Sequence, residues 1–172
     1  NSGIIHKDFL ANLCIEWEKA AENFSSVSKR VVCLRTAMVL AKNGGAFPML
    51  KKTVDFNIAS AVGSGKQWMN WIHIDDLVKM YIFAVENENV KGNFNAVADE
   101  IPTNKNFMKS LAATSNKFFL PINVPSFVLK IIFGEMSTII LEGTKASNKK
   151  IKSQGFDFKY NTIEKAFKNL IE

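Results

Sequence analysis

Helical periodicity is clearest at the two ends of the chain. From Asp8 to Phe24 the apolar side chains fall on one side and charged residues cover the rest, which predicts an amphipathic helix. A helix is also predicted from Phe47 or Pro48 to about Phe56, because proline suits a first helical position. A closing helix is predicted from apolar residues at helical spacing: Ile163, Ala166, Phe167 and Leu170.

Two shorter apolar runs predict strands. Val31 to Leu34 is continuous and mostly β-branched, which is typical of a strand that is buried on both faces of a parallel sheet. Gly92 to Val97 alternates apolar with polar residues and predicts a second strand. Strands that alternate with helices indicate an α/β fold, so we assign residues 1–99 to an α/β unit.

Residues 100–172 are predicted to form a mainly helical lobe. Thr103 is the expected N-cap of a helix. Pro121 to Pro125 indicates an extended connector, and Phe127 to Leu141 has the apolar composition of a mostly buried helix. We therefore expect the chain to divide near residue 99.

The stretch from Val62 to Leu77 joins a turn, a strand and the start of a helix. Gly63 and Gly65 permit a tight turn, after which Gln67 to Ile74 alternates at period two and predicts a short strand. Asp75 follows where a helix N-cap is expected. We expect the functional residues to gather around this stretch.

Composition and charge exclude several classes of function. The net charge is +6, but the excess consists mainly of scattered lysines in residues 100–172, so we expect a solvated lysine surface and no nucleic-acid partner. No run is apolar and long enough to cross a bilayer, and no signal peptide is recognisable, so no membrane partner is expected. The thiols of Cys14 and Cys33 have neither metal-site nor disulfide spacing, which favours a cytoplasmic protein without a metal.

The central stretch resembles a known family. Trp71-Ile-His-Ile-Asp-Asp-Leu77 resembles the aromatic-Ile/Val-His-Val-x-Asp-Leu/Val signature of extended short-chain dehydrogenase/reductases, the NAD-dependent epimerase/dehydratase superfamily. It is also similar to the G-S-G-x-Q-W-x-x-W-I-H-x-x-D pattern of an atypical branch of nucleoside-diphosphate-sugar epimerases with a small C-terminal extension of unknown role. The matching positions are Gly63, Ser64, Gly65, Gln67, Trp68, Trp71, Ile72, His73 and Asp76.

The resemblance implies the C-terminal part of a Rossmann-like NAD(P)-binding fold, followed by a mainly helical substrate lobe. The glycine-rich strand-turn-helix that cradles the dinucleotide pyrophosphate in this family has no counterpart in the sequence. NAD(P) is therefore implied as the cofactor of a full-length protein, and none is expected on this chain alone. We expect the incomplete sheet to be covered by an upstream N-terminal half or by another copy of the chain.

The resemblance leaves the catalytic residues unassigned. In the family, a Tyr and a Lys four residues later stand on the helix that precedes the strand at Val31. The two registers considered place Leu10 and Cys14, or Phe9 and Leu13, at these positions. Neither pair supplies the acid that exchanges a proton during hydride transfer.

A small-molecule substrate is expected outside the carboxyl ends of the strands. The predicted substrate-binding residues are Arg35, Gln67, Trp68, Trp71 and His73. Arg35 would supply a cation, and at least one tryptophan an aromatic wall, because residues three apart on a strand face opposite sides. Other roles stay open: an ion pair for Arg35, core packing for the tryptophans and a positioning role for His73.

Two functions agree with these residues. One is the substrate-side half of an NAD(P)-dependent epimerase/dehydratase-like oxidoreductase. The other is a non-catalytic ligand-binding or regulatory module on the same fold. A nucleotide-sugar substrate is disfavoured, because Met69 stands where the family places an arginine that holds the diphosphate.

Overall fold

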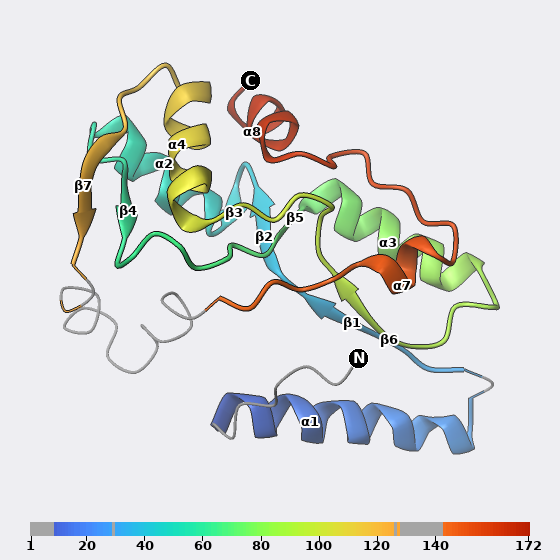
Figure 1. Cartoon of the computed structure of the whole chain (residues 1–172). Helices are drawn as coiled ribbons and strands as arrows, with labels where there is room; N and C mark the ends of the chain where they lie inside the picture. Colours follow the sequence, from blue (N-terminus) through green and yellow to red (C-terminus); the bar gives the residue numbers. More distant parts are fainter. Residues whose placement is uncertain (1–8, 29, 126, 128–142) are drawn as a thin grey trace.

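The computed structural model describes residues 9–28, 30–125, 127 and 143–172 (Figure 1). Most of the helix predicted from Phe127 to Leu141 lies outside these residues. The elements in chain order are α1 (Phe9–Glu22), η1 (Asn23–Ser26), β1 (Val32–Thr36), β2 (Met38–Ala41), β3 (Gly44–Gly45), α2 (Phe47–Asp55), β4 (Ser60–Val62), β5 (Trp71–His73), α3 (Ile74–Glu86), β6 (Gly92–Ala96), α4 (Asn104–Thr114), β7 (Leu120–Val124), α7 (Lys149–Lys152) and α8 (Ile163–Ile171).

The described strands form three small sheets. β1 runs parallel to β6, β4 runs parallel to β7, and β2 lies between the parallel β5 and the antiparallel β3. Parallel neighbours require crossover connections, which the helices supply. The predicted α/β class is confirmed.

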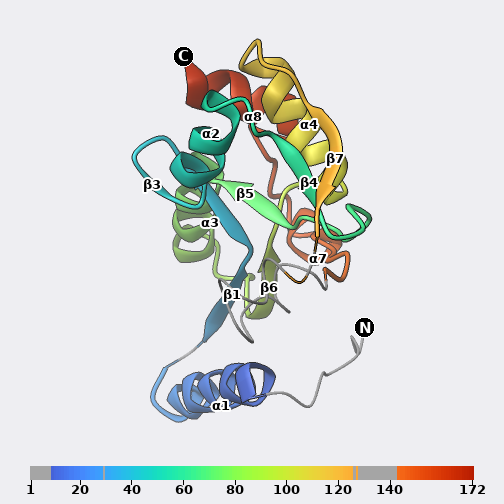
Figure 2. The same ribbon diagram turned by 90° about the vertical axis from the view of Figure 1, so that its left-hand side faces the viewer.

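The helices cover the sheets unevenly. α1 lies on one side of the β1–β6 pair and α3 on the other (Figure 1). The view in Figure 2 places α1 at the opposite end of the molecule from α4 and α8. Among the described residues, no helix is long and apolar enough to cross a membrane.

Two hydrophobic clusters form the core. The larger one joins β2, α2, α4 and α8 around Trp71, and the smaller one joins α3 and β6 to residues 151–158. Each cluster contains residues from before and after position 99. The domain boundary expected there stays a prediction.

Several local predictions are confirmed. The hydroxyl of Thr103 accepts a hydrogen bond from the Asn106 amide at 3.4 Å and caps α4. All four apolar residues predicted to define the closing helix are buried in α8. The strand predicted at Val31 to Leu34 pairs in parallel as β1. Its predicted burial on both faces is wrong: its side chains are only half-buried or exposed, because Val32 and Leu34 line an open hollow beside α3.

Three further predictions need correction. The strand expected from Gln67 to Ile74 is only Trp71–His73, because Trp68 makes an isolated bridge to Thr103 instead of continuing the ladder. The N-cap of α3 is His73, not Asp75. The connector expected at residues 121–125 is largely strand β7, which adds to β4.

Candidate functional site

The candidate site lies where β1 ends and β2 begins. At this point the pairing partner of the chain changes from β6 to β5. β1 pairs with β6 as far as Thr36, and the Ala37 amide still donates to the carbonyl of Ala96 at 3.2 Å. The next residue, Met38, begins β2 and pairs with Trp71 of β5. Ligands of open α/β sheets bind outside the carboxyl ends of the strands, so the ends of β1 and β6 are the place to examine.

Residues 143–148, here called the cover segment, pass over this point. Three asparagine side chains hold the segment to the sheet. Their hydrogen bonds are Asn70 Nδ2 to Thr144 O at 2.8 Å, Ala146 N to Asn70 Oδ1 at 3.0 Å, Asn95 Nδ2 to Ser147 O at 2.9 Å and Asn148 Nδ2 to Val97 O at 3.1 Å. Because both functional groups of Asn70 are used, this residue fixes the register of the segment.

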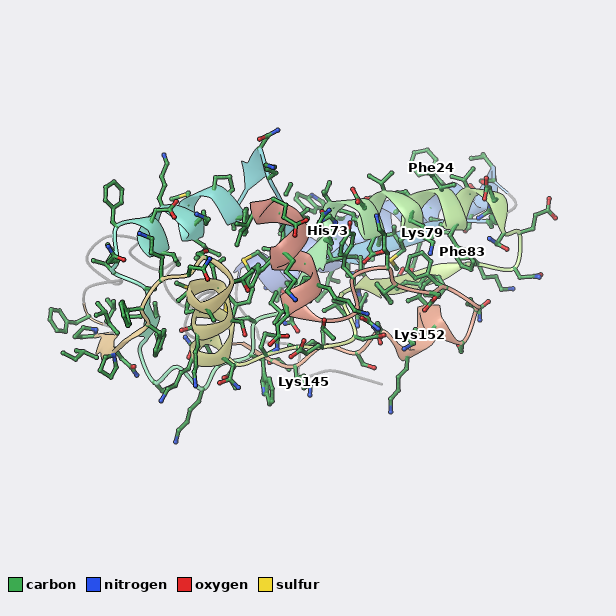
Figure 3. The ribbon with its side chains drawn as sticks, turned by 90° about the horizontal axis from the view of Figure 1, so that it is seen from above. Phe24, His73, Lys79, Phe83, Lys145 and Lys152 are labelled. Atoms are coloured by element: carbon green, nitrogen blue, oxygen red, sulfur yellow. The ribbon has the colours of Figure 1, made fainter. Side chains whose placement is uncertain are left out.

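Trp68 is the predicted aromatic wall that reaches the surface. Its side chain is 37% exposed, and the ammonium of Lys145 lies 4.5 Å from its ring centroid. Figure 3 shows Lys145 at the periphery of the molecule. A Cβ atom on Gly143 would lie 2.1 Å from the Trp68 carbonyl oxygen, so only glycine permits this close approach. The cover segment thus places a cation on the face of an indole.

Gln67 and Trp71 are buried and hold structure together. The Gln67 side chain donates to the Val62 carbonyl at 3.0 Å across the glycine turn. The indole nitrogen of Trp71 donates to the Glu100 carbonyl at 2.8 Å, and its ring is fully buried. Trp71 therefore belongs to the core. Core packing was one of the roles that the sequence left open for this residue.

His73 is a buried helix cap. Its Nδ1 accepts the Asp75 amide at 3.1 Å, so the neutral ring carries its proton on Nε2. Burial lowers the pKa of His73, and the carboxylates of Asp75 and Asp76 oppose this only in part. The ring stacks on Tyr160 with centroids 3.8 Å apart, inside the molecule beside α3 (Figure 3). Its Nε2 makes no hydrogen bond of good geometry with the described residues.

Arg35 points toward α1 and is engaged in an ion pair. Its guanidinium donates to both carboxylate oxygens of Glu18, at 2.5 and 2.6 Å, and Asn93 donates to the same carboxylate at 2.9 Å. The hydrogen bonds from Arg35 lower the pKa of Glu18. The ion pair left open by the sequence is therefore present, and a substrate role for Arg35 stays a prediction.

Asp76, named above only as a position of the family pattern, ties two distant parts of the chain together. Its carboxylate is buried and accepts the amides of Lys159 and Tyr160 at 2.8 and 2.9 Å. The three asparagines were also missed, since isolated amides carry no periodic signal. Among the described residues, no three His, Cys, Asp or Glu side chains come together closely enough to hold a metal ion.

Comparison with known proteins shows which family the chain resembles. Residues 18–97 match the NAD dependent epimerase/dehydratase family, and residues 124–170 match a domain of unknown function, DUF1731. An epimerase family protein of Staphylococcus haemolyticus is 38% identical over 167 residues, which are 96% of this chain and 55% of that protein. Over most of its length, the chain is similar to proteins of the NAD-dependent epimerase family. It spans about half the length of the curated relatives it matches.

Solved structures of this family extend the likeness to three dimensions. The human epimerase family protein SDR39U1, solved with NADPH, is similar with a TM-score of 0.85 and 29% identity, over 95% of this chain and 55% of that protein. UDP-N-acetylglucosamine 4-epimerase of Bacillus cereus is similar with a TM-score of 0.72 but only 15% identity, which shows the fold alone. The chain therefore has the fold of one part of a larger Rossmann-like protein.

Proposed function

We propose that this chain forms the substrate-side half of an NAD(P)-dependent oxidoreductase of the epimerase family. The observation that carries the proposal is the similarity of 95% of the chain to human SDR39U1, a protein solved with NADPH. The cofactor would supply or accept a hydride. The residues of this chain bind and orient the substrate at the ends of β1 and β6.

The cover segment and Trp68 are the walls of the proposed substrate site. The half-exposed indole of Trp68 offers an apolar surface, and the Lys145 ammonium over its ring offers a positive charge. This pair suits a small molecule with a flat apolar body and an anionic group. Lys145 takes over the role predicted for Arg35, whose guanidinium is already paired with Glu18.

A second candidate is a ligand-binding module without catalysis. It is favoured by α1, where neither register considered, Leu10 with Cys14 or Phe9 with Leu13, supplies the family's Tyr and Lys. On the first proposal, the proton that accompanies hydride transfer comes from a group outside α1. On the second, no hydride is transferred.

A chimaera tests the proposal. In the chimaera, the part of human SDR39U1 that matches this chain is replaced by this chain. We expect the chimaera to bind NADPH in calorimetric titration with an affinity within about tenfold of the human parent, and the chain alone to bind none. Trp68→Ala and Lys145→Ala should leave the NADPH affinity unchanged, because both residues lie on the substrate side. Phe118→Ala, at an exposed aromatic outside the site, is the matched control.

Two outcomes would overturn the proposal. Micromolar binding of NADPH to the chain alone would place the cofactor on this half. A chimaera that is folded by circular dichroism but binds no NADPH would favour the non-catalytic module.

A further inference from the structure

Helices α2 and α4 end in the same way and lead into the neighbouring strands β4 and β7. Each helix is followed by an asparagine in the left-handed conformation, with φ of 58° at Asn57 and 54° at Asn116. The two strands then run in parallel, with Ser60 opposite Leu120. The starts of β4 and β7 therefore lie side by side, close to the ends of α2 and α4 (Figure 1, Figure 2).

Large apolar side chains stand out from the protein at these strand starts. Phe119 packs against the larger hydrophobic cluster, so the alternate residues of this stretch face the opposite side. Five exposed apolar residues gather on that side and at the adjoining start of β4, with exposed fractions of 75% for Phe56, 57% for Ile58, 86% for Phe118, 39% for Leu120 and 78% for Ile122. They are here called the apolar tip. Such a group of exposed apolar side chains marks an interaction surface.

The same part of the molecule is strongly basic. Residues 42–66 and 101–125, which contain α2, β4, α4 and β7, hold seven lysines and a single carboxylate, Asp55. Asp55 pairs with Lys51, and none of the other six lysines makes an ion pair with a described residue. Lys117 stands directly before Phe118. The partner of the apolar tip is therefore expected to be both apolar and negatively charged.

A second copy of the chain fits this surface poorly. Among the described residues, β4 is the one strand that pairs with β7. The Leu120 amide donates to the Ala59 carbonyl, so the next residue, Pro121, stands at the outer edge of β7, where it removes a backbone donor. Two copies that met through their apolar tips would also bring their lysines together. Pairing of copies through β7 is therefore disfavoured.

We propose that the apolar tip docks on the surface of an anionic lipid bilayer. Phe56, Phe118 and Ile122 enter the boundary between headgroups and acyl chains, because side chains that are three-quarters exposed or more stand out from the protein. The lysines lie at the headgroups, whose negative charge attracts them. The expectation of no membrane partner rested on the absence of a run that could span a bilayer, and a surface contact needs no such run.

Docking at the apolar tip is independent of the proposed function. The glycine turn and Trp68 follow the end of β4, whereas the tip is centred on the starts of β4 and β7. The cover segment and the ends of β1 and β6 contribute no residue to the tip. Binding to a bilayer and binding of a substrate can therefore be measured separately.

The experiment measures co-sedimentation of this chain with vesicles made of equal parts of phosphatidylserine and phosphatidylcholine. We expect binding that weakens as salt is added and that is absent with vesicles of phosphatidylcholine alone. Lys117→Glu should weaken binding more than Lys91→Glu does. Lys91 is an exposed lysine outside the tip, and the two substitutions change the net charge equally.

Phe118→Ala tests the apolar part of the contact. It should weaken binding by about tenfold or more, because burial of an aromatic ring is worth at least that factor. Phe24→Ala is the matched control: Phe24 is 64% exposed and lies beside α1, so binding should change by less than about twofold. Both rings are largely solvated in the free chain, so neither substitution should unfold it.

Insertion of the tip is separated from adsorption by charge alone with Phe118→Trp. Brominated acyl chains should quench the added tryptophan of bound Phe118→Trp, and should not quench the added tryptophan of bound Phe24→Trp. Equal quenching of the two variants would overturn the inference, as would equal losses of binding in Phe118→Ala and Phe24→Ala.

Three further outcomes would also overturn it. The first is a failure of the chain to bind the acidic vesicles. The second is binding by this chain that the chimaera with human SDR39U1 lacks, since the tip would then be covered in a longer protein. The third is a different occupant: a dimer that Phe118→Asp dissociates would identify a second copy, and tighter binding to polyglutamate than to vesicles would identify an acidic protein.

Discussion

Helices α8 and α1 have the same kind of amphipathic sequence, but they differ in how far their apolar side chains are buried. In α8 the apolar residues are buried against α4, and Phe167 packs on Phe107 with ring centroids 5.0 Å apart. In α1 none of the described side chains is buried. The comparison teaches that an amphipathic pattern identifies the face that is suited to burial, while the partner must be present elsewhere in the fold. Among the described residues, α8 has a partner in α4, whereas no described side chain of α1 is buried.

The largest expected difference is between aromatic truncations in the two helices. Phe167→Ala should lower the free energy of unfolding by about 3–5 kcal/mol, because it leaves a cavity beside Phe47 and Phe107. Trp17→Ala should change it by less than about 0.5 kcal/mol, since the ring is largely solvated. Urea unfolding of the chain alone measures both. Equal losses would mean that α1 is packed in solution.

The second prediction concerns pH and the contact between α3 and the C-terminal residues. Because the pKa of His73 is lowered by burial, the unfolded chain binds a proton before the folded chain does as the pH falls. Stability should therefore be constant above the ordinary histidine pKa of about 6.5 and should decline below it. The groups that face the ring are Asp75, Asp76, Lys159, Tyr160 and Asn169.

Thermal unfolding at a series of pH values measures this decline. His73→Asn keeps a side chain that can cap α3 and removes the titrating group. Its stability should fall less steeply than that of the parent between pH 7 and pH 5. If the stability of His73→Asn and of the parent fell equally with pH, a group other than His73 would be responsible for the decline.

The smallest effect is expected at the contact that holds α1 to the sheet. Glu18→Gln removes the charge that pairs with Arg35, and the loss should be about 0.5–1 kcal/mol because the guanidinium is more than half exposed. The lowered pKa of Glu18 means that this contribution is present above the ordinary glutamate pKa and is lost as the pH falls through the folded value. Denaturation at low and high salt should show the loss shrinking with added salt. A loss that salt does not change would indicate packing instead.

The sequence predicted those features that depend on neighbouring residues. Thr103 as a cap and the apolar face of α8 follow from local spacing, and both are confirmed. The parallel pairing of β1 followed from its continuous apolar residues. Its incomplete burial could not be foreseen, because burial depends on which other elements are present.

The site was less predictable, because its contacts join residues far apart in the sequence. Asn70 and the cover segment are 74 positions apart, and no periodicity links them. His73 replaced Asp75 as the cap because an imidazole nitrogen can accept an amide hydrogen as well as a carboxylate can. The proposed roles of Gln67, Trp68, Trp71, His73 and Arg35 in substrate binding remain predictions.

The buried carboxylate of Asp76 has a consequence for how the chain is made. Its two hydrogen-bond donors, the amides of Lys159 and Tyr160, stand 83 and 84 positions later. During synthesis α3 leaves the ribosome long before those amides exist, and a buried carboxylate without donors is costly. The beginning of α3 must therefore stay solvated until Lys159 and Tyr160 have been synthesised. Asp76 makes the presence of Lys159 and Tyr160 a condition for closing the core around α3, so a chain that ends before these residues would have a solvated helix start.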